Sequence, residues 1–119
     1  MEGHQVKGII ESLIVEIGHC RRDIESKGIA RANAIKNYDM RLAIALSTLR
    51  NSENYELAGK SYKSPPVSIM EKIAKGICAD ELEKREIAES AYKAVISNLE
   101  ALKAQLNGYQ SIYKHADSM

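Results

Sequence analysis

Phenylalanine and tryptophan are absent from this chain of 119 residues, and proline occurs only twice. Any hydrophobic core must therefore be built from Ile, Leu, Val, Ala and the six tyrosines. Narrow seams between packed helices accept such side chains, whereas the core of a β-sandwich needs more aromatic and β-branched residues. These absences favour an all-α fold.

The sequence also lacks long apolar runs and a strong charge of either sign. No run approaches the ~20 apolar residues that a membrane-spanning helix needs, and no charged segment leads into an apolar one at the N-terminus, as in a secretory signal peptide. The net charge is +1 with 28% charged residues, which excludes the basic footprint of a general nucleic-acid binder. Cys20 and Cys78 are far apart in the sequence, as suits a reducing compartment. We expect a cytoplasmic protein with no membrane partner.

A heptad pattern dominates the last third of the chain. From Ala88 onward, apolar residues recur at alternating steps of four and three, which keeps one face of a helix against a partner helix. Stripes with the same spacing run from Val6 to Ile24 and from Ile35 to Leu49. An isolated pair of helices leaves much apolar surface exposed, so we expect self-association into a helical bundle. The expected oligomer seam consists of Tyr92, Val95, Leu99, Leu102, Leu106, Tyr109 and Tyr113.

Breaks in the pattern predict one helical domain over residues 1–119. It would be an antiparallel, coiled-coil-like hairpin of long helices over about 5–50 and 81–115, joined by a loop at 51–67 and a short helix at 68–75. Ser68 with Glu71, and Asp80 with Glu83, resemble capping boxes that would start the second and third helices. Gly28 either ends a first helix or lies within a continuous one, and the alanines after it favour continuity.

No group of residues predicts catalysis, a metal site or a bound cofactor. His19 and Cys20 are adjacent and so point about 100° apart on a helix, which disfavours a nucleophile pair. Glu16 shares a helix face with Cys20, and Asp23 shares one with His19, but the two faces do not coincide, which disfavours a metal site. Gly59-Lys60-Ser61 resembles the end of a phosphate-binding loop, but the upstream glycine and the preceding strand are missing. We expect the protein not to be an enzyme.

Two segments are candidates for binding a partner. Tyrosines and lysines gather in the predicted loop. The loop could be an exposed surface that contacts a protein, a surface on which single-stranded bases stack, or a passive connector. The helix before the loop carries a modest run of cations that would suit an acidic partner or would simply be solvated. The candidate partner-binding residues are Tyr55, Lys60, Tyr62 and Lys63 in the loop, and Arg21, Arg22, Lys27 and Arg31 on the helix.

The chain resembles small helical proteins of phages and prophages of Gram-positive bacteria. The likeness rests on the stretch KGIARANAIKNYDMRLAIALSTLR, on AKG at the end of the short helix and on AESAYKAVISNLEALKAQLNGYQSIYKH. Genes for such proteins often lie among early genes for DNA recombination and host takeover. The resemblance implies a phage setting and contributes no catalytic residues.

These observations predict a non-enzymatic phage protein that acts by stoichiometric binding to a bacterial host protein. A counter-defence inhibitor fits best, because such a protein works by contact alone. One alternative is an accessory protein of phage DNA recombination or replication that binds single-stranded nucleic acid. A weaker alternative is an oligomer that sequesters a small nucleotide signal between its subunits.

Overall fold

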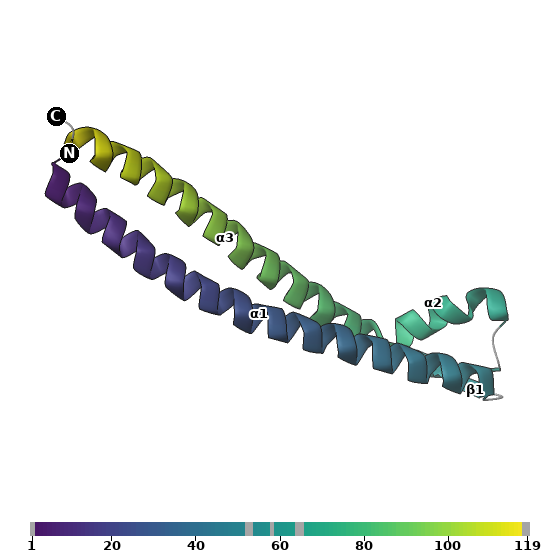
Figure 1. The fold of residues 1–119 in the computed structure, drawn as a ribbon. Coiled ribbons are helices and arrows are strands. Elements are labelled where there is room, and N and C mark those ends of the chain that lie inside the picture. The colour runs from purple at the N-terminus through teal and green to yellow at the C-terminus, as the bar shows by residue number, and fades with distance from the viewer. Residues whose placement is uncertain (1, 52–53, 58, 64–65, 118–119) are drawn as a thin grey trace. The chain divides into compact units, whose positions relative to one another are not determined.

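The described residues of the computed structural model form three helices and a small two-stranded sheet. The structure describes residues 2–51, 54–57, 59–63 and 66–117. Their order is α1 (Gly3–Asn51), β1 (Asn54–Leu57), β2 (Lys60–Lys63), α2 (Val67–Ile77) and α3 (Ala79–Asp117) (Figure 1). The chain divides into two compact units, of which the first comprises Met1–Ile29 with Ser90–Met119 and the second Ala30–Glu89.

In the first unit, the N-terminal part of α1 packs against the C-terminal part of α3. The buried cluster joins Leu13, Ile17 and Cys20 of α1 to Leu102 of α3. The Cys20 thiol donates a hydrogen bond to the Val95 carbonyl oxygen at 3.4 Å. The start of α1 and the end of α3 accordingly lie side by side in Figure 1.

The second unit has a core to which all three helices contribute. Its buried residues are Tyr38, Ala45, Leu49, Met70, Ala74 and Cys78. Leu82 at the start of α3 packs against this cluster. The short helix α2 covers the last turns of α1, which therefore have an apolar partner within the chain.

Both units show that α1 and α3 run antiparallel, because higher residue numbers in one helix meet lower numbers in the other. In the first unit, Cys20 contacts Val95 and Gly28 lies beside Tyr92. In the second, Arg31 pairs with Glu89 and Arg41 with Glu81. The predicted all-α hairpin of two long helices with a short connecting helix is thereby confirmed. α1 continues through Gly28 without a break, and a Cβ added there would lie 3.5 Å from Tyr92 Cε2, an ordinary contact.

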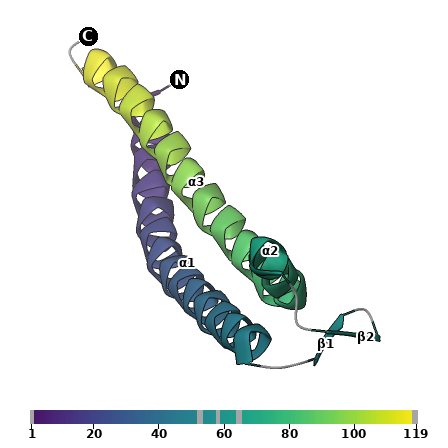
Figure 2. The ribbon, with the colours of Figure 1, turned by 90° about the vertical axis from the view of Figure 1, so that its right-hand side faces the viewer.

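The predicted boundaries need three corrections. Residues 51–67 are not a plain loop, because they contain the antiparallel strands β1 and β2 in the register Tyr55↔Tyr62 and Leu57↔Lys60. Gly59 has φ +77°, a conformation that tight hairpin turns require and that glycine adopts without a steric penalty. Figure 2 shows the two strands beside each other.

The second correction concerns where α2 begins and ends. Pro66 precedes its first residue, and no side chain caps the helix, so Ser68 does not serve as the cap. α2 also runs past Gly76 to Ile77, because Ile73 and Ile77 both pack against the core of the second unit.

The third correction concerns the start of α3. Cys78 is fully buried, its N–H donates to the Ala74 carbonyl at 3.1 Å, and its own carbonyl accepts from the Leu82 N–H at 2.9 Å. Cys78 therefore both ends α2 and precedes α3, and Asp80 lies inside the helix instead of capping it.

Candidate partner-binding surfaces

The hairpin β1–β2 brings the four candidate residues of the predicted loop into one element. Tyr55 and Tyr62 are opposite each other in the register, and Asn54 is opposite Lys63. The Lys60 side chain is exposed, whereas those of Tyr55, Tyr62 and Lys63 lie outside the described part. Among the described residues, β1 and β2 pair only with each other. β1 also contacts α2, so the outer edge of β2 is the better candidate for accepting another strand.

The sequence signal for this hairpin was present but weak. Gly59 separates two short segments that each contain a tyrosine, as in a strand-turn-strand pattern. Polar residues such as Asn54 and Lys63 obscure the alternation, and strands of four residues give little pattern to detect.

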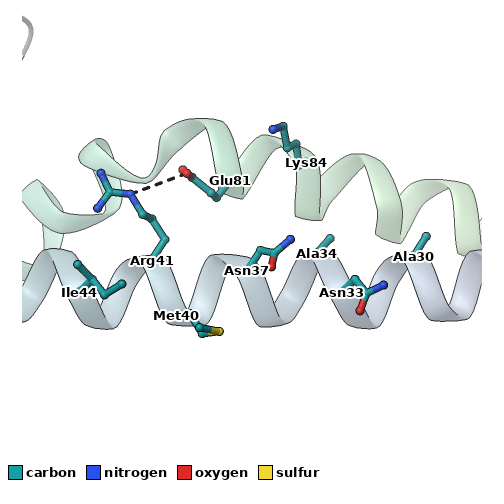
Figure 3. A pocket seen from close by; sticks show the side chains of 9 residues that line it. All are labelled: Ala30, Asn33, Ala34, Asn37, Met40, Arg41, Ile44, Glu81 and Lys84. Atoms are coloured by element: carbon teal, nitrogen blue, oxygen red, sulfur yellow. Dashed lines mark ion pairs between the residues drawn. The ribbon is translucent and has the colours of Figure 1, made fainter.

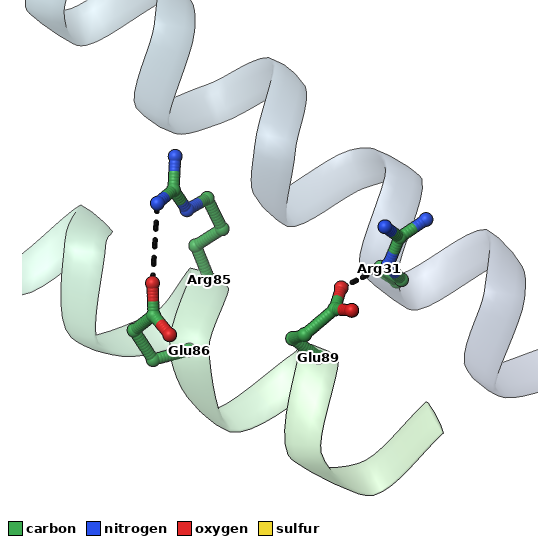
Figure 4. Close-up of polar contacts among 4 residues, drawn as sticks. All are labelled: Arg31, Arg85, Glu86 and Glu89. Atoms are coloured by element: carbon green, nitrogen blue, oxygen red, sulfur yellow. Dashed lines mark hydrogen bonds and ion pairs between the residues drawn. The ribbon is translucent and has the colours of Figure 1, made fainter. Parts of the chain in front are cut away.

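The candidate cations on α1 have different surroundings. Arg21, Arg22 and Lys27 are exposed in the first unit, where they can meet a partner. Arg31, in the second unit, forms an ion pair with Glu89 of α3 (Figure 4). Its side chain is 39% exposed. The guanidinium of Arg31 thus joins α1 to α3. Its first role is structural, and binding a partner would be a second role.

A second arginine stabilises the same region through an aromatic ring. The guanidinium carbon of Arg85 lies 4.6 Å from the centre of the Tyr38 ring, within the range of a cation–π contact. Arg85 also pairs with Glu86 at 3.1 Å, within α3 (Figure 4). These pairs are partly exposed, so each contributes about 1 kcal/mol or less to stability.

Residues of the predicted oligomer seam pack within the chain, between α1 and α3. Leu102 is buried against α1 of the same chain, and four further seam residues pack on that cluster, namely Val95, Leu99, Leu106 and Tyr109. Tyr92 lies beside Gly28, and Tyr113 is half-buried. The structure therefore shows that these residues pack within one chain. Self-association through the same residues stays a prediction.

The second unit has a groove that the sequence did not predict. A groove of about 520 Å³ runs along α1 beside the start of α3 (Figure 3). Met40 and Ile44, which line it, are 54% and 55% exposed. Arg41 reaches across to Glu81 at 3.8 Å. We call this surface the α1 groove, and it is lined by Ala30, Asn33, Ala34, Asn37, Met40, Arg41, Ile44, Glu81 and Lys84.

The α1 groove has its own spacing in the sequence. Positions 30, 34, 37, 41 and 44 again alternate steps of four and three, about 100° around the helix from the buried stripe. The small and polar members of this set hid it, because alanine is a good helix former anywhere and asparagine is typical of exposed positions. A search for a second heptad stripe on α1 would have found it.

The remaining reactive groups have simple surroundings. Cys20 is buried and His19 is exposed, as their positions on the helix predict. Burial raises the pKa of the Cys78 thiol, an effect that Glu81 adds to and that Arg41 opposes. In the described part of the chain, no three His, Cys, Asp or Glu side chains gather to hold a metal ion. None of the described helices carries an apolar stretch that could cross a bilayer.

Comparison with protein-family models, with curated proteins and with solved structures finds no match to this chain.

Proposed function

We propose that this protein acts by stoichiometric binding to a bacterial protein and that the hairpin β1–β2 is its main contact surface. The observation that carries the proposal is the pairing pattern of the hairpin, whose strands bond only to each other among the described residues. A two-stranded hairpin is marginally stable in water by itself. A partner that adds a strand beside β2 would satisfy the backbone groups of that edge and order the hairpin.

The charges near this surface favour an acidic or mixed partner. β2 begins with the exposed Lys60, and Lys63 ends it. Arg21, Arg22 and Lys27 form a second exposed cationic site on α1. Tyrosine in a partner-facing segment adds contact area at a small cost in side-chain entropy. The resemblance to phage proteins favours a host protein as partner and a counter-defence inhibitor as the role.

The decisive experiment is capture of host proteins from bacterial lysate with the tagged full chain, read by mass spectrometry. The triple variant Lys60→Ala, Tyr62→Ala and Lys63→Ala should lose a stoichiometric partner while keeping its helical circular dichroism. A matched control, Lys103→Ala with Lys114→Ala, removes the same two charges from exposed positions on α3 and should retain the partner. Gly59→Val, which strains the turn at φ +77°, should weaken capture through the backbone alone.

Retention of the partner by both the triple variant and Gly59→Val would refute the hairpin as the contact surface. Binding of single-stranded nucleic acid is tested on the same proteins. It predicts a polarisation change with a labelled oligonucleotide at low salt that falls steeply as salt increases. A strong, salt-dependent signal that the triple variant loses would replace the protein-binding proposal with that alternative.

A further inference from the structure

The outer edge of β2 presents backbone groups at two positions. The register places Leu57 opposite Lys60 across the turn, and residues that flank such a turn direct their backbone groups at each other. Inward-facing and outward-facing residues then alternate along a strand. The N–H and C=O groups of Lys60 and Tyr62 therefore face β1, and those of Ser61 and Lys63 face the outer edge. An incoming strand can bond to β2 at these two positions.

The strand β2 carries two positive charges and no negative one. It contains the four residues Lys60, Ser61, Tyr62 and Lys63, so a lysine occupies each end. A second copy of β2 at this edge would bring four lysines and no carboxylate into one ladder, where like charges repel each other. Carboxylates opposite the two lysines would attract them instead. The charges of β2 therefore favour an acidic strand over another copy of this chain.

We propose that the outer edge of β2 binds an extended acidic segment of the partner protein, in which two carboxylates lie three residues apart. This inference rests on the proposed function, because it specifies what the hairpin β1–β2 contacts. In an antiparallel strand, the first carboxylate lies opposite Lys63 and the second opposite Lys60. The residue after the first carboxylate lies opposite Tyr62, where an aromatic or β-branched side chain makes a favourable cross-strand pair.

The backbone alternation of β2 makes the proposed pairing testable one bond at a time. Strand addition draws affinity from main-chain hydrogen bonds and selectivity from side chains. The partner residues opposite Ser61 and Lys63 exchange both N–H and C=O bonds with β2, whereas the residues between them turn those groups away. Methylation of one peptide nitrogen therefore either removes a bond to β2 or leaves every bond in place. A general attraction between charges would not depend on which nitrogen carries the methyl group.

Binding of labelled synthetic peptides to the full chain, followed by fluorescence polarisation up to about 1 mM protein, tests the inference. The probe GTEVTETG has the proposed spacing, and GTEVETTG has the same composition with its carboxylates two residues apart. The probe should bind about threefold more tightly, because it alone places a carboxylate opposite both lysines. Methylating the nitrogen of its central threonine, which lies opposite Ser61, should abolish binding. Methylating the nitrogen of its valine should leave binding intact.

Charge reversal in the protein gives a complementary test. Lys60→Glu with Lys63→Glu should lose GTEVTETG and gain GTKVTKTG, a peptide that the wild type should reject. Binding of the second peptide also shows that the variant keeps its hairpin. Lys103→Glu with Lys114→Glu is the matched control, because it reverses two exposed charges on α3, and it should bind GTEVTETG as the wild type does.

Three results would overturn the inference. The probe does not bind up to this concentration, so that the lysines only protect the edge from aggregation; both methylated probes bind equally well; or both spacings bind equally well. Capture from lysate tests the proposed function separately. Capture that needs the hairpin, without binding of the probe, leaves the proposed function standing with a different kind of contact. Capture that does not need the hairpin refutes the proposed function itself.

Discussion

Gly28→Ala should make this protein more stable. Glycine inside a helix is less favourable than alanine by about 0.8–1.0 kcal/mol, because it loses more backbone entropy on folding. Gly28 lies in the interior of α1, and the added methyl group would meet Tyr92 Cε2 at 3.5 Å, a normal van der Waals distance. The helix-propensity gain is thus not offset by a clash, and we expect about 0.5–1 kcal/mol of stabilisation.

Thermal unfolding followed by circular dichroism at 222 nm can resolve this effect. A chain of this size unfolds with an entropy of about 0.25 kcal/mol/K, so the expected rise in Tm is about 2–4 °C. Gly18→Ala is the matched control, because Gly18 also lies inside α1 and has no atom within 4 Å of its added Cβ. It should show the helix-propensity gain alone.

Gly28→Ala would refute this reasoning if it lowered Tm while Gly18→Ala raised it. That pair of results would mean that α1 bends or ends at Gly28, the alternative that the sequence left open, or that Tyr92 approaches closer than an added methyl group allows.

Two further predictions concern the core of the second unit. Leu49 is 1% exposed and Ile44 is 55% exposed on the same helix. Leu49→Ala should therefore lower the free energy of unfolding in urea by about 2–4 kcal/mol, and Ile44→Ala by less than about 1 kcal/mol. Similar losses for the two variants would place Leu49 outside the core. Because burial raises the pKa of the Cys78 thiol, its contribution to stability is present below about pH 9 and is lost as pH rises through the higher folded value. Cys78→Ala should accordingly flatten the loss of stability above about pH 9, and an unchanged pH profile would contradict this.

Periodicity predicted the helices well because it repeats many times within each of them. Apolar residues that repeat over five or more heptad steps, as from Tyr92 to Tyr113, lie on one face only if the segment is a helix. The choice of partner for that stripe is a different question. The same Leu99 and Leu102 can pack on α1 of their own chain or on another copy, and the local sequence is identical in both cases. The structure assigns Leu102 to the hairpin.

The elements that sequence reasoning misplaced are short ones whose positions depend on distant contacts. α2 passes through Gly76 because Ile73 and Ile77 have a buried surface to meet, which outweighs the helix-breaking tendency of glycine. The junction at Cys78 is fixed by complete burial of that residue. Neither effect is visible in a window of ten residues, since the contacting side chains come from α1.

The candidate surfaces differ in the same way. Residue type alone marked Lys60 and the tyrosines of the hairpin as candidates for partner binding. The turn at Gly59 is enough to bring them into one element. The α1 groove was harder to predict, because its lining includes alanine and asparagine, which are equally common on ordinary exposed helix faces. Only the packing of α3 beside α1 makes these positions the wall of a groove.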